Sequence, residues 1–169
     1  INWNFSAVAI NDKEAQLVFK GTLEDGWHVY SQHMAPDGPL PTSFSFIPSA
    51  DYTLMGNVHE EGKTITYFDS TFLMDIAYFN KAAAFSQKVQ LRSPAVMIRG
   101  SVKFMVCKDD RCLPPEEISF VLEAKTNPSV SSSSIKKSPG RNSKSSITNS
   151  SNHHIIKSSR HTAAGPGDK

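Results

Sequence analysis

The chain has 169 residues, enough for one domain of ordinary size, and its formal charge of +2 conceals a division near Thr126. Residues 1–126 contain every aromatic side chain and carry 11 Lys/Arg and 15 Asp/Glu, a net charge of −4. The remainder holds 13 serines, 7 Lys/Arg and one acid. The positive charge is therefore a property of the tail, which argues against a nucleic-acid-binding face on the domain. No apolar run approaches the roughly 20 residues that span a bilayer.

The division predicts a folded domain over residues 1–126 and a tail over residues 127–169. Serine runs such as residues 131–134 cannot bury enough apolar surface to offset chain entropy. We expect this tail to be a disordered linker or terminal extension. Because the chain starts without Met and shows no signal-peptide pattern, we expect Ile1 to be a trimmed end.

Alternation of apolar and polar residues, the period of a half-buried strand, recurs through the first domain. The predicted strands are residues 3–10, 15–20, 27–31, 42–47, 52–58, two within 64–79, then 85–91, 96–106 and 118–122. Residues 35–41 are rich in proline and predict a loop, residues 59–63 predict a charged turn, and residues 81–84 could form one helical turn. About nine or ten short strands without a sustained helical period predict an all-β antiparallel sandwich.

The two cysteines of the chain, Cys107 and Cys112, follow the clearest strand pattern and are soon followed by two prolines. Residues that face each other across the end of a hairpin can form a disulfide without distorting the strands. As a structural staple, so short a loop would contribute on the order of 2 kcal/mol, against about 4–5 kcal/mol for a loop of a hundred residues. An exposed pair is also easy to reach and reduce. A structural disulfide and a redox-active pair therefore both remain open.

Metal binding and hydrolysis are less well supported at this pair. Structural zinc usually takes four Cys/His ligands, and the histidines of the domain lack a ligand-like spacing to the cysteines. Those histidines are His28, His33 and His59. No particular histidine stands out as the base of a cysteine hydrolase. We therefore expect no metal and no cofactor.

The charges between the cysteines nearly cancel. Lys108 and Arg111 would favour a thiolate. Asp109 and Asp110 would oppose it. If the pair is redox-active, we expect a partner protein to supply part of the activation. A disulfide here would imply an oxidising compartment.

Two groups of aromatic residues allow more than one interpretation. Trp27 and Tyr30 fit packing in the core or at its rim. The dense run over residues 64–79, broken at Asp69-Ser70-Thr71, fits two core strands joined by a turn. It also fits a loop whose aromatic residue covers a reactive group.

Several segments together resemble the amino-terminal periplasmic domain of the thiol:disulfide interchange protein DsbD, over about residues 3–124. They are Gly26–Ser31, Gly38–Thr42, Phe68–Phe72 and Gly100–Cys107 continued through Cys112–Glu116. The most specific string is a Cys, a short acidic insert, a second Cys, one residue and Pro-Pro-Glu. The insert is shorter than in the best-known member of the family, and Leu73 stands where a Gly is common.

The resemblance implies an immunoglobulin-like sandwich that works in a protein-disulfide reductase. It implies that Cys112 forms mixed disulfides with partner proteins and that Cys107 resolves them. It further implies a cap loop that shields the pair, with Phe72 as the shielding ring. The residues of that loop are Phe68, Asp69, Ser70, Thr71 and Phe72.

The resemblance also implies partners and a location. A thioredoxin-like domain of the same membrane protein would donate electrons, and periplasmic disulfide isomerases or cytochrome c maturation proteins would accept them. The domain would be periplasmic and would meet the membrane only through further segments.

Two other functions are alternatives to this thiol:disulfide exchange. One is a non-catalytic immunoglobulin-like binding module with a structural disulfide, and the other is a metal-handling domain that uses Cys107, Cys112 and a Met or His.

Overall fold

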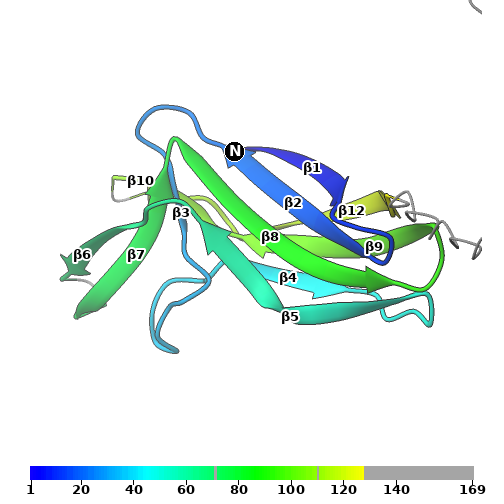
Figure 1. Cartoon of the computed structure of the whole chain (residues 1–169). Helices are drawn as coiled ribbons and strands as arrows, with labels where there is room; N and C mark the ends of the chain where they lie inside the picture. Colours follow the sequence, from blue (N-terminus) through cyan, green and yellow to red (C-terminus); the bar gives the residue numbers. More distant parts are fainter. Residues whose placement is uncertain (71, 110, 128–169) are drawn as a thin grey trace, which may run out of the picture. The chain divides into compact units, whose positions relative to one another are not determined.

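Twelve β-strands form the regular structure of residues 1–70, 72–109 and 111–127, the part of the chain that this computed structural model describes (Figure 1). They are β1 (Asn2–Ala9), β2 (Glu14–Thr22), β3 (His28–Tyr30), β4 (Ser43–Phe46), β5 (Tyr52–Glu61), β6 (Ile65–Asp69), β7 (Met74–Asn80), β8 (Ala82–Leu91), β9 (Ala95–Phe104), β10 (Val106–Lys108), β11 (Arg111–Cys112) and β12 (Glu116–Lys125). All the strand pairings are antiparallel. The predicted all-β fold is therefore confirmed.

Two of the three sheets form most of one hydrophobic core, to which the third sheet adds Val29, Phe79 and Val106. One has the strand order β1-β2-β8-β5 and the other has the order β12-β9-β4. Alternation along β2, β8 and β9 buries Phe19, Phe85 and Ile98 completely. Phe19 also meets Phe120 of β12 across the core, with ring centroids 5.0 Å apart. Burial of one apolar face of each sheet is the main stabilising contribution to this sandwich.

The third sheet carries the cysteines and has the strand order β11-β10-β3-β7-β6. Figure 1 shows its labelled strands gathered at one end of the sandwich. Three of its strands continue strands of the sandwich along the chain. β3 follows β2, β7 leads into β8, and β10 follows β9 after a break at Met105. The sandwich therefore holds the third sheet in place through several connections.

Two local expectations are wrong. The turn predicted over residues 59–63 is wrong for residues 59–61, because β5 runs through Glu61 and pairs with β8 along this segment, and the chain bends only at Gly62. Their charges are tolerated because β5 is an edge strand. Residues 82–84 form the start of β8 and pair with β2, where Ala83 is buried, so there is no helical turn. The chain reverses instead at Lys81, which has a left-handed φ of 64°.

Gly100 lies where three strands of the second sheet approach closely. It pairs with Phe46 of β4 on one side and with Phe120 of β12 on the other. A β-carbon at this position would lie 2.2 Å from the carbonyl oxygen of Ser45 and 2.5 Å from the Phe120 ring. The absence of a side chain is therefore required for this packing.

Most of the predicted tail, residues 128–169, lies outside the described residues, so the boundary at Thr126 remains a prediction. The backbone N–H of Asn127 still donates to the carbonyl of Asn11 at 2.9 Å, which ties the last described residue to the β1–β2 turn. In the described ranges, no helix is long and apolar enough to cross a membrane.

Candidate active site

A disulfide joins Cys107 and Cys112 across the short β10–β11 hairpin. The two residues are direct partners in the strand register. The turn between the strands passes through Asp109, which has a left-handed φ of 49°. After the hairpin, the N–H of Leu113 donates to the Val106 carbonyl at 3.0 Å, and prolines then end the ladder. The expected pairing of these two cysteines is thus present, at the edge of the third sheet.

The two ends of the disulfide differ in their exposure to solvent. Cys107 is 1% exposed and lies in a small apolar cluster with Tyr30 and Ile76. Cys112 is exposed on the edge strand β11. An incoming thiolate must approach along the axis of the sulfur–sulfur bond, so Cys112 is the end that a second protein can reach. Cys107 is correspondingly placed to be the leaving group.

The buried sulfur has a hydrogen-bonding neighbour that sequence reasoning missed. The hydroxyl of Tyr30 donates to Cys107 Sγ at 3.3 Å, and His28 Nε2 lies 3.5 Å from the same hydroxyl. Strand β3 brings both side chains here because His28 is the register partner of Cys107. Tyr30 is buried, as the packing interpretation expected, but its hydroxyl contacts the sulfur.

Burial shifts the pKa values of these two neighbours in opposite directions. Burial lowers the pKa of His28 below its usual value of 6.5, partly opposed by the negative charge of Asp109. Burial raises the pKa of the Tyr30 hydroxyl above 10, and the charge of Asp69 raises it further. Tyr30 therefore remains a proton donor toward the sulfur over the physiological range of pH.

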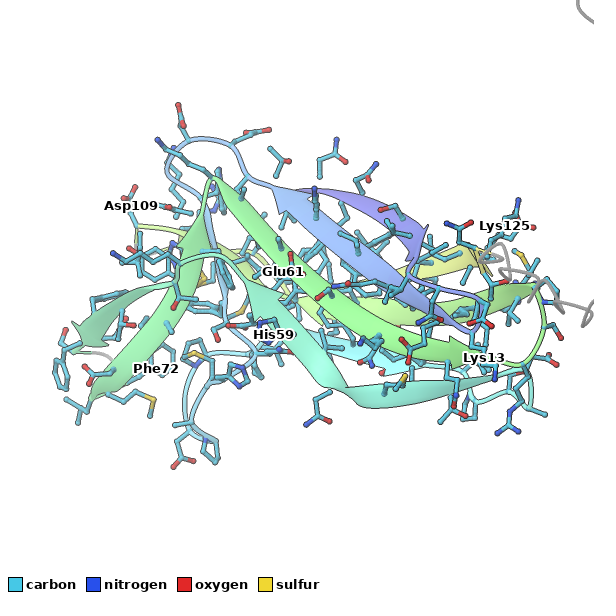
Figure 2. The ribbon with its side chains drawn as sticks, viewed as in Figure 1. Lys13, His59, Glu61, Phe72, Asp109 and Lys125 are labelled. Carbon is cyan, nitrogen blue, oxygen red and sulfur yellow. A yellow bond between two sulfur atoms is a disulfide. The ribbon has the colours of Figure 1, made fainter. Side chains whose placement is uncertain are left out.

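The loop expected to cap the pair connects β6 to β7, and Figure 2 shows Phe72 near the tip of this hairpin. Asp69 organises the loop: it accepts from the Tyr67 hydroxyl at 2.9 Å and from the Phe72 N–H at 3.2 Å. The chain then turns at Leu73, which has a left-handed φ of 54°.

The exposure of the side chains in the β6–β7 loop shows how much of each is free to face solvent and not the disulfide. Phe68 is 62% exposed and Phe72 is 37% exposed, so much of each ring faces solvent. Ser70 is also exposed, and Thr71 lies outside the described residues. The loop nevertheless borders the buried cysteine, because Met74 at its end packs on the cluster that contains Cys107.

The described residues contain no group of three or more His, Cys, Asp and Glu side chains that could hold a metal ion. Of the charged residues between the cysteines, Lys108 donates to the Asp25 carbonyl at 3.3 Å, which holds its ammonium against the connection between β2 and β3. Asp110 lies outside the described residues.

Comparison with known proteins gives a family and two similar structures. A family model described as "Thiol:disulfide interchange protein DsbD, N-terminal" matches residues 2–124. The N-terminal domain of DsbD from Neisseria meningitidis, in the reduced form, is 14% identical, with a TM-score of 0.48 over 72% of this chain and 85% of that one. The N-terminal periplasmic domain of ScsB from Proteus mirabilis is 12% identical, with a TM-score of 0.49 over 75% of this chain and 46% of that one. No curated protein sequence gives a significant match.

Proposed function

The chain belongs to the family of the N-terminal domain of the thiol:disulfide interchange protein DsbD, and on this premise we propose that it is a dithiol/disulfide relay domain. The observation that carries the proposal is a short-loop disulfide with one buried and one exposed cysteine. A structural staple gains nothing from such asymmetry. An exchange reaction does, because it requires one accessible sulfur and one protected resolving sulfur.

In the proposed reaction, the thiolate of reduced Cys112 attacks a disulfide of the acceptor protein. A bond forms between Cys112 Sγ and one acceptor sulfur, and the other acceptor sulfur leaves as a thiolate. Cys107 then attacks Cys112 Sγ, which releases the first acceptor sulfur and restores the Cys107–Cys112 disulfide. Two electrons pass to the acceptor, and an upstream dithiol returns the domain to its reduced form.

The direction of transfer and the partners follow the family. The proposed donor is a thioredoxin-like domain, and the proposed acceptors are periplasmic disulfide isomerases or thioredoxin-like proteins of cytochrome c maturation. The domain would then be a protein-disulfide reductase module of a larger membrane enzyme, folded over residues 1–126. A periplasmic location agrees with the disulfide, since such bonds persist in oxidising compartments.

Two single-cysteine variants test the proposal with oxidised glutathione as the acceptor. Reduced Cys107→Ser should accumulate a mixed disulfide on Cys112, because no resolving thiol remains. Cys112→Ser should react far more slowly, because Cys107 is buried. Mass spectrometry of quenched samples identifies the adducts. If the wild type and both variants reduce glutathione at one common rate, the proposed exchange does not occur.

We also propose that the β6–β7 loop restricts access to the pair. Phe72→Ala removes the ring nearest the loop tip, and it should speed the reduction of the oxidised domain by dithiothreitol several-fold (Figure 2). The control is Val121→Ala, which removes an exposed apolar side chain from β12. Equal rates for Phe72→Ala and the wild type would mean that this ring does not shield the disulfide.

A further inference from the structure

The proposed exchange leaves one chemical requirement unassigned. When the disulfide opens, the electron pair of the broken bond goes to Cys107, whose buried sulfur must then be protonated to reach its resting thiol form. A thiolate in an apolar cluster is costly without a proton or a hydrogen-bond donor. A route for protons to this sulfur is therefore needed.

A water-accessible cavity lies beside the disulfide hairpin, next to the apolar cluster, because Tyr78 both lines the cavity and packs on that cluster. It has a volume of about 310 Å³, and its lining includes His28, Tyr78 and Asp109. The His28 ring packs on the Tyr78 ring, with centroids 4.6 Å apart, which fixes its orientation. His28 therefore lies between this cavity and the hydroxyl of Tyr30.

The contacts from His28 to the sulfur form an unbroken series. His28 Nε2 lies 3.5 Å from the Tyr30 oxygen, and the Tyr30 hydroxyl donates to Cys107 Sγ at 3.3 Å. The tautomer of His28 that carries its proton on Nε2 can donate to Tyr30 while Tyr30 donates to the sulfur. The 3.5 Å contact between nitrogen and oxygen is within hydrogen-bonding range, and so is the 3.3 Å contact to sulfur, because sulfur acceptors form longer hydrogen bonds.

We propose that His28 and Tyr30 form a proton route from this cavity to the buried sulfur of Cys107. The inference rests on the proposed exchange at Cys112. Tyr30 is the catalytic residue, because its hydroxyl contacts a reacting atom. His28 is a positioning residue that acts through Tyr30 and connects it to solvent.

When a thiol reduces the oxidised domain, the electrons and the protons of the step each have a source. The incoming thiolate forms a bond to Cys112 Sγ, the Cys107–Cys112 bond breaks, and its electron pair remains on Cys107 Sγ. Tyr30 gives its hydroxyl proton to that sulfur and receives the Nε2 proton of His28. His28 takes a proton from water in the cavity. One proton enters from solvent, and the electrons come from the incoming thiolate.

The groups around this route all bear on its pH dependence. Tyr30 and Tyr78 face His28 from β3 and β7, and Asp109 faces it from the disulfide turn. Asp25 and Lys81 complete the charged lining of the cavity. Asp69 approaches Tyr30 from β6. The negative charge of Asp109 opposes the lowering of the His28 pKa by burial.

The test measures the rate at which dithiothreitol reduces the oxidised full chain between pH 4.5 and 8. Each rate is divided by the concentration of dithiothreitol thiolate at that pH, which removes the titration of the reductant from the profile. We expect the corrected wild-type rate to rise as the pH falls through the pKa of His28, below 6.5. His28→Gln keeps an amide N–H toward Tyr30 but does not titrate, so its profile should be flat. Tyr30→Phe should be flat as well and slower by about tenfold, the effect of losing a hydrogen bond to a charged group.

Two further variants separate a proton route from a structural effect. Asp109→Asn keeps a residue that tolerates a left-handed φ and removes the charge, so the inflection should move to lower pH. His59→Gln changes a histidine on β5, which lies in a different sheet from the disulfide hairpin, and should leave the profile unchanged (Figure 2).

An inflection that persists in His28→Gln or in Tyr30→Phe would overturn the proposal. Rates lowered by one common factor at every pH, with the wild-type pH dependence kept, would overturn it too, because a structural role predicts that result. Either outcome leaves the exchange itself standing, provided that Cys107→Ser still forms the glutathione adduct on Cys112. Loss of that adduct would instead contradict the proposed function.

Discussion

Reduction of the Cys107–Cys112 disulfide should lower the free energy of unfolding by only about 2 kcal/mol and leave the domain folded. The bond closes a loop with a sequence separation of 5, and the chain-entropy relation assigns about 2 kcal/mol to so short a loop at 25 °C. A bond that closed a hundred-residue loop would contribute about 4.7 kcal/mol. A relay domain needs this small value, because its reduced form must keep its shape.

The rest of the hairpin explains why the fold survives reduction. Strand β10 remains paired with β3 through Val106 and Cys107, and the Cys107 side chain stays in its apolar cluster. By thermodynamic linkage, about 2 kcal/mol makes the folded pair more reducing than the unfolded pair by roughly 40 mV.

Urea unfolding of the oxidised and the fully reduced protein measures this difference directly. The Cys112→Ser variant serves as a control, because it lacks the disulfide and changes an exposed side chain. Its stability should match that of the reduced protein. A reduced form that is unfolded, or a difference near the value for a long loop, would refute the reasoning and mark the disulfide as structural.

Three other predictions concern packing, polar contacts and pH. Gly100→Ala forces a β-carbon against the Ser45 carbonyl and should cost about 1–3 kcal/mol in urea unfolding; a neutral effect would mean that β9 can shift at no cost. Glu60→Ala removes the acceptor of the Ser31 hydroxyl, at 2.9 Å, and should lower the free energy of unfolding by about 1–3 kcal/mol because that hydroxyl is buried. A decrease no larger than that of an ordinary surface substitution would show that Ser31 finds another partner. The pKa of Tyr67 is raised to about 12 by burial and by the carboxylate that it bonds, whereas an unfolded tyrosine titrates at about 10. The folded state therefore holds this proton more tightly, and stability should fall as the pH rises from 10 toward 12. Tyr67→Phe should make that fall shallower, and an unchanged slope would contradict the shift.

The strands were predictable because their apolar faces alternate. The even-numbered positions from Val96 to Val106 indicated one buried face, and the structure buries all of them except the half-buried Gly100, in two strands separated at Met105. The end of β5 was not predictable from composition, since Glu60 and its charged neighbours are typical of a turn. They lie on an edge strand, and the Glu60 carboxylate turns inward to accept from Ser31.

The cysteine pair was visible in the sequence, but its environment was not. Spacing alone left a structural bond and a redox bond equally open, because it does not reveal which cysteine faces the core. The contact of Tyr30 with Cys107 joins residues 77 positions apart and depends on the pairing of β3 with β10. No local pattern encodes that pairing. A tyrosine two residues after His28 on a short strand was the available signal, and it fits core packing equally well.

The reduction potential of the Cys107–Cys112 pair tests the central claim most directly. The folded protein would be equilibrated in dithiothreitol or glutathione redox buffers, and the oxidised fraction would be measured by alkylation and mass spectrometry. A pair that exchanges with other proteins should have a potential between about −300 and −180 mV, the range that spans thioredoxins and disulfide isomerases. A potential far below about −300 mV would mean that the bond is permanent, and the proposed relay would have no working dithiol.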